Sequence, residues 1–240
     1  MKRLLGKDFP QFDRRTLRLS QYVDLGKLPP LPDADDNYQK LSRMTMAMNN
    51  EKSCCVVSGA VHAVQVWSSM AAREQIISDV DLLKVYNRLS PSDNGLNELA
   101  FLNWWTKNPL SGHPLGMFVA VNPQNQAMIK QAIHLFGGVM LGVGLPLSAQ
   151  NQTVWDLVQG GPDSAAYSWG GHCTIVGQYD KAGNLYHYTW GEKQKATPAF
   201  SLYYDEAYAL LGLDWFKADH KSPDGLAWAD LKADLARVKG

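Results

Sequence analysis

A cysteine that follows a short polar loop is the residue best placed to do chemistry in this chain. The loop from Asn49 to Cys54 leads into an apolar run that begins at Cys55 and continues to Trp67. This pattern predicts that Cys55 lies in the first turn of a buried helix. Unpaired N–H groups and the helix dipole favour a thiolate at such a position. A thiolate is a nucleophile, and it needs a base to take its proton.

His172 is the candidate base, 172 − 55 = 117 residues after the cysteine and at the start of a predicted strand. His62 is nearer in sequence, but seven residues along a helix span roughly 10 Å, which is too far for a hydrogen bond to Cys55. We therefore expect His62 to be buried with a hydrogen-bond partner. A cysteine and a histidine from distant segments can meet across a cleft between two lobes, where the imidazole takes the proton and returns it to the leaving group.

Polar residues of the predicted helix share the face of the thiol. This face either lines a cleft or hydrogen-bonds to the neighbouring layer, and its residues are Cys55, Ser58, His62 and Gln65. Strand alternation sends Cys173 to the face opposite His172, which predicts a core position. Cys54 is either exposed in the loop or tucked beside Cys55, and we expect it to take no part in the chemistry.

The elements that must position these residues are helices first and strands second. Hydrophobic periodicity predicts helices over residues 55–73, 76–89, 97–107, 124–136 and 205–211, and a terminal helix marked by Trp228, Leu231, Leu235 and Val238. Strands are predicted over 116–121, 139–145, 172–180, 185–190 and 200–204, with a short strand or extended arm near Thr16 to Ser20. This order predicts an α+β fold in which a helical lobe faces an antiparallel sheet lobe.

The domain organisation follows from composition. Residues 1–40 are rich in proline and charge, which predicts an extended arm that wraps over the domain, with a loose solvated tail as the alternative. The main domain spans 41–216, with a helical lobe at about 41–136 and a sheet lobe at about 137–216. Residues 217–240 are expected to form a C-terminal helical tail.

Composition narrows the function classes. The 23 basic and 23 acidic residues balance, so the basic surface that nucleic-acid binding needs is not expected. The run from Phe136 to Leu147 is too short to span a membrane, and Met1 to Asp8 lacks the apolar core of a signal peptide. Three cysteines make no disulfide framework. We expect a soluble protein of a reducing cytoplasm.

Metal and cofactor sites are not expected. His172 and Cys173 are adjacent on opposite faces of a strand, and no other histidine or cysteine repeats the paired spacing of a zinc site. Gly137 and Gly138 follow a predicted helix, whereas a phosphate-binding loop opens one. The chemistry would therefore rest on side chains alone.

Three segments together resemble the papain-like cysteine peptidase superfamily: Asn49 to His62, Gly170 to Asp180, and Tyr188 to Gly191. Within it, the chain is most similar to a group of uncharacterised phage and prophage proteins that share an "FDxRTLxL" arm, an "N-D-x-x-G-D-C" loop and a closing "TWG". The arm motif matches residues 12–19. Similarity to this group covers roughly residues 10 to 216, whereas similarity to papain itself is at the level of the fold.

The resemblance implies site roles. Cys55 matches the nucleophile and His172 the general base. Asn49, six residues before Cys55, matches the glutamine that helps to hold the oxyanion, and its amide offers an N–H. Tyr188 stands where these enzymes have the asparagine that orients the imidazole, so a tyrosine oxygen would have to accept from the ring N–H. Ser53 and Cys54 replace the usual Gly-Asp.

Two functions are consistent with the sequence. The first is a papain-like cysteine hydrolase of phage or prophage origin that cleaves a peptide or amide bond. The second is a catalytically silent papain-like fold that serves as a structural or interaction protein of the virion. The partners would be a peptide or protein substrate in the first case and other virion proteins in the second. In both cases we expect expression in the bacterial host cytoplasm, with incorporation into the virion as a further expectation.

Overall fold

The helices of the protein lie mostly in the first half of the chain. The computed structural model describes residues 2–21, 30–216 and 221. Its α-helices are α1 (Cys55–Met70), α2 (Asp79–Leu89), α3 (Glu98–Trp105) and α4 (Gln126–Phe136). Ser78, Asn97 and Asn125 cap α2, α3 and α4 by accepting a hydrogen bond from a first-turn N–H. The side chain of Cys54, the N-cap of α1, accepts no such bond.

The strands form one sheet. They are β1 (Asp35–Asp36), β2 (Leu115–Ala120), β3 (Val139–Leu145), β4 (Val154–Trp155), β5 (Gly170–Tyr179), β6 (Leu185–Thr189), β7 (Glu192–Ala196) and β8 (Tyr204–Gly212). The order is β2-β8-β3-β5-β6-β7-β4, and β1 pairs with β5. All neighbouring pairs are antiparallel except β4 with β7.

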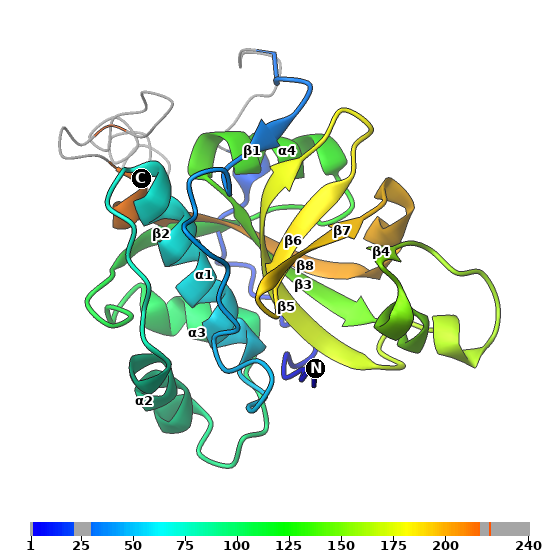
Figure 1. Cartoon of the computed structure of the whole chain (residues 1–240), viewed down its shortest axis with the longest axis horizontal. Coiled ribbons are helices and arrows are strands. Elements are labelled where there is room, and N and C mark those ends of the chain that lie inside the picture. The colour runs from blue at the N-terminus through cyan, green and yellow to red at the C-terminus, as the bar shows by residue number, and fades with distance from the viewer. Residues whose placement is uncertain (1, 22–29, 217–220, 222–240) are drawn as a thin grey trace.

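Helix α1 lies between the sheet and the other helices of the first half (Figure 1). All 16 of its residues are buried, because valines, alanines and small polar residues cover its whole circumference. The indole of Trp67 donates to the carbonyl of Phe136 at 3.0 Å. A Cβ on Gly212 would lie 2.0 Å from the Trp67 ring, so only glycine lets the end of β8 pass this helix.

The predicted α+β class is confirmed, with Cys55 as the first residue of the central helix and His172 on an antiparallel strand. The main helices and the predicted strands 116–121, 139–145, 172–180 and 185–190 are found within a few residues of their expected bounds.

Two neighbouring predictions are wrong. Residues 205–211 belong to β8, and Pro198–Tyr203 is a 3-10 helix where a strand was expected. β8 hydrogen-bonds to both β2 and β3 and is buried along nearly its whole length. A strand buried on both faces shows no alternation of apolar and polar residues, so periodicity alone does not separate it from a buried helix.

The N-terminal arm, the C-terminal tail and the lobe boundary differ in how far the structure tests their predictions. Near the expected strand at Thr16 to Ser20, Arg18 makes an isolated bridge to Ala120 and Leu19–Gln21 is a 3-10 helix. The predicted terminal helix lies outside the described residues. The lobe boundary near residue 136 stays a prediction, and β2, which precedes it, pairs with β8 in the sheet.

Candidate functional site

Cys55 begins α1 and faces the sheet. Its side chain is fully buried, and the backbone amide of Cys173 on β5 acts on the thiol as a hydrogen-bond donor. Burial raises the pKa of Cys55 to about 12, and the Cys173 amide offsets only part of this effect. The thiol is therefore neutral in this structure, contrary to the lowered pKa expected from the helix start. Its position places it beside the residue that follows His172.

His172 is held from two sides. Its Nε2 atom lies 2.7 Å from Oγ1 of Thr189, and its ring stacks on Trp190 with centroids 4.3 Å apart and planes 8° apart. Trp190 has a φ of 47°, which is uncommon for a bulky residue and indicates that its surroundings hold the ring in place. The Nδ1 atom of His172 is buried and has no hydrogen-bond partner in the described part of the chain. This nitrogen is available to take a proton.

The electrostatic surroundings keep the imidazole neutral. Burial is the main cause that lowers the pKa of His172 well below its usual value, and the nearby His187 and His62 lower it further. A neutral thiol and a neutral imidazole are therefore the ground state of this covered site. A thiolate–imidazolium pair requires the site to open to water or to substrate.

Tyr188 does not orient His172. Its hydroxyl donates to Oε1 of Gln65 at 2.7 Å and accepts from the backbone N–H of Thr45 at 2.6 Å. Its ring stacks on His62 with centroids 3.8 Å apart. Thr189, the next residue, makes the contact to His172 that was expected from Tyr188. Side chains alternate along a strand, so Tyr188 and Thr189 lie on opposite faces of β6. Thr189 is the one on the face of His172.

Asn49 is buried in the loop that precedes α1. Its Oδ1 atom has no hydrogen-bond partner among the described residues, and its backbone carbonyl accepts from the N–H of Leu4 at 2.9 Å. Buried amides are normally paired, so an orphaned oxygen is a feature to explain. The expected role of Asn49 at the oxyanion stays a prediction.

The polar stripe of α1 hydrogen-bonds to the neighbouring layer. Ser58 donates to the carbonyl of Ala47 at 2.8 Å, His62 Nε2 lies 3.0 Å from the carbonyl of Thr45, and Gln65 donates to the carbonyl of Arg43 at 2.8 Å. The prediction that His62 is buried with a partner is confirmed, and burial lowers its pKa to about 3.

The other two cysteines are also buried. Cys54 is tucked into the core, 3.3 Å from the hydroxyl of Ser58, and burial raises its pKa to about 11. Cys173 is in the core as predicted, on the face of β5 that meets α1 near Gly59. Within residues 2–21, 30–216 and 221, none of the three thiols makes a hydrogen bond to an imidazole.

The N-terminal segment, residues 2–9, occupies the junction between the helices and the sheet (Figure 1). The N–H groups of Gly6 and Lys7 both donate to the carbonyl of Gly171, at 3.2 and 3.1 Å, directly before His172. On the helical side, Leu96 donates to the carbonyl of Gly6 at 2.8 Å and accepts from Asp8 at 3.1 Å. The indole of Trp190 donates to the carbonyl of Leu4 at 3.2 Å. The segment thus covers the Cys55 and His172 region from both lobes.

Glycines allow this close passage. A Cβ on Gly6 would lie 1.9 Å from the carbonyl oxygen of Ser53, and a Cβ on Gly171 would lie 2.2 Å from the carbonyl oxygen of Lys7. Gly95 has a φ of 85°, and its Cβ would meet the carbonyl oxygen of Gly6 at 2.2 Å. Such separations do not occur between real Cβ atoms and backbone, so any side chain at these positions would displace the segment.

Lys7 and its acidic partners form a buried cluster that the sequence pattern did not predict. The Lys7 side chain is fully buried, and its ammonium lies 3.1 Å from Asp205 and 2.9 Å from Glu206. Glu98, on α3, is also buried beside them. One signal was present: Glu98 is an acidic residue at the start of a helix that is otherwise mostly apolar.

Metal sites and membrane-spanning helices are absent from the described residues. Within residues 2–21, 30–216 and 221, no group of three His, Cys, Asp or Glu side chains is arranged to hold a metal ion. The same ranges contain no helix with the length and hydrophobicity that membrane crossing requires.

Solved structures that share this fold include cysteine proteases. Xylellain, a cysteine protease from Xylella fastidiosa, superimposes with a TM-score of 0.69 at 14% identity, over 88% of this chain and 96% of its own. Procathepsin B of Trypanosoma congolense gives 0.62 at 10% identity, over 87% and 86%. The Carica candamarcensis cysteine protease CMS1MS2 gives 0.56 at 15% identity, over 75% and 99%. No protein-family model and no curated protein matches the sequence. The chain therefore has the papain-like cysteine protease fold.

Proposed function

We propose that this chain, which has the papain-like fold, is a cysteine hydrolase of peptide or amide bonds. Cys55 is the nucleophile, His172 is the general base and acid, and Thr189 orients the imidazole. The observation that carries the proposal is the state of His172: Nε2 is bound to Thr189, the ring is stacked on Trp190, and the buried Nδ1 is left without a partner. An imidazole held in this way, on the strand against which the cysteine-bearing helix α1 packs, supports a nucleophile–base pair.

The mechanism proceeds in two steps. The sulfur of Cys55 attacks the carbonyl carbon of the substrate while Nδ1 of His172 takes the thiol proton. The negative oxygen of the tetrahedral intermediate is held by the backbone N–H of Cys55 and the amide of Asn49. His172 returns its proton to the leaving amine as the C–N bond breaks, which leaves a thioester on Cys55. Water activated by His172 hydrolyses the thioester and restores the thiol.

The structure represents a covered form of this site. Segment 2–9 lies over Cys55 and His172, and burial holds the thiol pKa at about 12. Withdrawal of the segment exposes the thiol to water, which removes the desolvation that raises its pKa. Activity thus requires the segment to leave, and the open form is the one that hydrolyses substrate.

Alkylation by iodoacetamide near neutral pH tests the assignment of the nucleophile. Cys55→Ala should abolish labelling in protein whose cleft is open, whereas Cys54→Ala and Cys173→Ala should leave it unchanged. His172→Ala should slow labelling, because the base that stabilises the thiolate is lost. Labelling of Cys55 that follows an ordinary thiol pKa near 8.5 in the open form would contradict an activated pair.

The position of segment 2–9 over the cleft also favours a second function, that of a catalytically silent binding protein. A segment bound to both lobes and a neutral thiol are also what a silent fold used for binding would show. In this alternative the protein is a structural or interaction component of a phage virion. Stoichiometric co-sedimentation with virions, together with no effect of Cys55→Ala on infectivity, would support it. A phage or prophage origin and the cytoplasmic location of the chain stay predictions from the sequence.

A further inference from the structure

The Lys7 side chain fills a pocket of carboxylates beside the proposed active site. We call Glu98, Asp205 and Glu206 the acidic pocket. The Lys7 ammonium lies 3.1 Å from Asp205 and 2.9 Å from Glu206, with none of its side chain exposed. Burial alone would lower the pKa of Lys7, but Glu206, Asp205 and Glu98 outweigh it and raise the pKa above the usual value. A lysine buried this deeply requires a site that is built for its charge.

The acidic pocket holds three carboxyl groups against the single ammonium of Lys7. Neither carboxylate oxygen of Glu98 makes a hydrogen bond of normal geometry within the described ranges, although the Cys173 thiol lies near enough to act on its pKa. Burial first, and then Glu206, raise the pKa of Glu98 well above its usual value. A fully buried acid with no firm partner next to two further carboxylates is costly unless a cation is present.

The shape of the acidic pocket fits a linear side chain that ends in an ammonium. Gly142 of β3 forms its floor, because a Cβ there would lie 2.3 Å from Cε of Lys7. The Tyr167 ring lies 5.9 Å from the ammonium and closes one side as a cation–π partner. The Tyr167 hydroxyl donates to Asp205, and that of Tyr208 donates to Glu206 at 2.9 Å, so both carboxylates are held in place.

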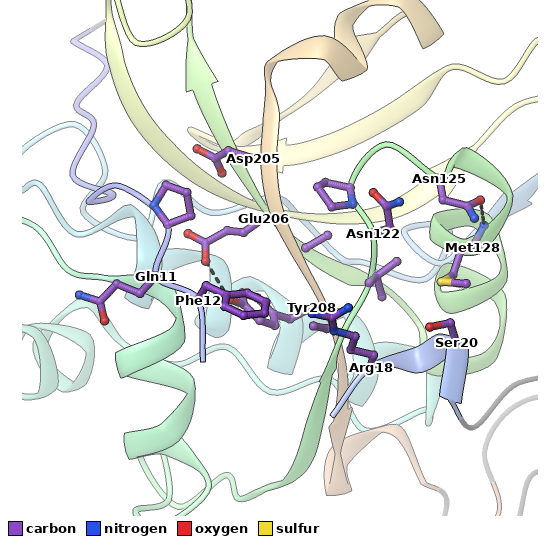
Figure 2. Close-up of a pocket in the computed structure, with 15 residues that line it drawn as sticks. Gln11, Phe12, Arg18, Ser20, Asn122, Asn125, Met128, Asp205, Glu206 and Tyr208 are labelled. Atoms are coloured by element: carbon purple, nitrogen blue, oxygen red, sulfur yellow. Dashed lines mark hydrogen bonds between the residues drawn. The ribbon is translucent and has the colours of Figure 1, made fainter. Parts of the chain in front are cut away.

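The acidic pocket is close to the catalytic residues. The backbone N–H of Lys7 is bound to Gly171, the neighbour of His172. On its other side, Asp205, Glu206 and Tyr208 border a cavity of about 590 Å³ between the arm and β8. Figure 2 shows Phe12 and Arg18 of the arm at this cavity, with Glu206 hydrogen-bonded to Tyr208. Chain that replaces segment 2–9 in the cleft would therefore pass over the same carboxylates.

We propose that the acidic pocket is a specificity pocket that binds a lysine side chain of the peptide substrate once segment 2–9 has left the cleft. This inference rests on the proposed hydrolase function, since it names the substrate class of the same site. Lys7 then occupies, within the covered form, the place of a substrate lysine. Removal of Lys7 leaves buried carboxylates unpaired, which favours replacement by another ammonium over replacement by an apolar or acidic side chain.

Binding and cleavage can be tested separately with full-length protein. In Gly6→Ala, the added Cβ meets Ser53 and displaces the segment. Binding of blocked alanine-rich hexapeptides, with lysine, norleucine or glutamate placed in turn at each position, is measured by calorimetry on Gly6→Ala combined with Cys55→Ala. At one position lysine should bind at least tenfold more tightly than norleucine, and glutamate should bind more weakly than both. Cleavage of the same peptides is measured on Gly6→Ala alone.

Three further variants locate the selectivity. Glu206→Gln should reduce the lysine preference to less than threefold, and Asp163→Asn, an exposed carboxylate in a separate turn, should leave it unchanged. Gly142→Ala fills the floor and should also reduce the preference, so the test does not depend on one variant folding well. Equal binding of lysine and norleucine peptides at every position would overturn the inference, whether or not they are cleaved. Selective binding of lysine peptides without cleavage would instead overturn the hydrolase function and support the acidic pocket.

Discussion

The Nε2 atom of His172 lies 2.7 Å from the Oγ1 atom of Thr189, and this contact fixes which ring nitrogen is left for chemistry. With Nε2 engaged, only Nδ1 can serve as the base, and Nδ1 is the buried atom without a partner in the described ranges. Papain-like enzymes are expected to use an asparagine one position earlier, where this chain has Tyr188. When Nδ1 is the base, Nε2 keeps its hydrogen in both protonation states, so Thr189 Oγ1 accepts a hydrogen bond from it throughout.

Thr189→Val should lower kcat/KM roughly 100-fold in the Gly6→Ala background, because an unoriented imidazole is rarely in line with the thiol. KM should change little, since Thr189 is buried and bonds to Nε2 of the imidazole. Steady-state kinetics of a cleaved peptide measure this effect. Thr189→Ser keeps the hydroxyl and should restore most of the rate. Equal loss in the serine variant would show that Thr189 acts only through packing.

Gly6→Ala should increase the rate of Cys55 alkylation by at least tenfold at pH 8, because a Cβ 1.9 Å from the Ser53 carbonyl oxygen cannot be accommodated. The rate is measured by mass spectrometry of iodoacetamide-treated protein. Gly112→Ala is the control: its Cβ meets nothing within 4 Å, although its φ of 91° strains the loop. If Gly112→Ala accelerates labelling as much as Gly6→Ala, the effect is general destabilisation and segment 2–9 is not the cover.

The pH dependence of Cys55 alkylation should differ between the covered and open forms. Burial raises the pKa of Cys55 to about 12 in the covered form, so the thiolate fraction should rise about tenfold per pH unit with no plateau below pH 10. In Gly6→Ala the plateau should appear at a lower pH, because water reaches the sulfur. A pH–rate profile between pH 6 and 10 for both proteins measures this shift. Coincident profiles would contradict a cover that sets the pKa.

Three buried histidines should make the protein less stable as the pH falls below 6.5. Burial lowers the pKa of His62 and His187 to about 3, and that of His172 well below 6.5. Below pH 6.5 these histidines therefore bind protons in the unfolded chain but stay neutral in the folded protein. Each histidine contributes a loss of about 1.4 kcal/mol of unfolding free energy per pH unit between 6.5 and its folded pKa. The raised pKa values of Glu98 and Glu206 act in the opposite direction above pH 4.5.

A variant isolates the histidine effect from the carboxylates. His187 bonds to Thr174 at 2.9 Å and to the hydroxyl of Tyr204 at 2.9 Å, and His187→Gln keeps hydrogen-bonding groups but does not titrate. The pH slope of the unfolding free energy between pH 6.5 and 4.5 should be smaller by about 1.4 kcal/mol per unit in this variant. Urea unfolding at several pH values measures both slopes. Parallel slopes would show that His187 is protonated in the folded protein.

The packing of the Cys55 helix against the strand that carries His172 was predictable from sequence, because each residue lies near the start of a clearly patterned element. The apolar run after Cys55 indicates a buried helix, and the glycines before His172 indicate a strand start. The identity of the orienting residue was not predictable. Tyr188 and Thr189 are adjacent, and only the register of β6 against β5, with Tyr188 opposite Ile175, decides which side chain faces the imidazole.

The strand β8 and the docking path of segment 2–9 were not predicted, for different physical reasons, although residues 1–40 were expected to wrap over the domain. β8 is buried on both faces, so it lacks the alternation by which a strand is recognised. Segment 2–9 has no secondary structure of its own, and its backbone hydrogen bonds go to Leu96, Gly171 and Asn49, far away in sequence. Long-range pairing of this kind leaves little local pattern. The sequence features that point to this segment are Gly6 beside Lys7 and, in the helical half, Gly95, which allows Gly6 to pass close to it.

The most direct test of the central claim is the reaction of Gly6→Ala protein with a peptidyl chloromethyl ketone at pH 7, with the modified residue located by mass spectrometry. We predict a single adduct on Cys55 whose rate of formation falls at least tenfold in His172→Ala and is unchanged in His62→Gln. An adduct on Cys54 or Cys173, or a rate that does not depend on His172, would contradict the assignment of Cys55 and His172 as the catalytic pair.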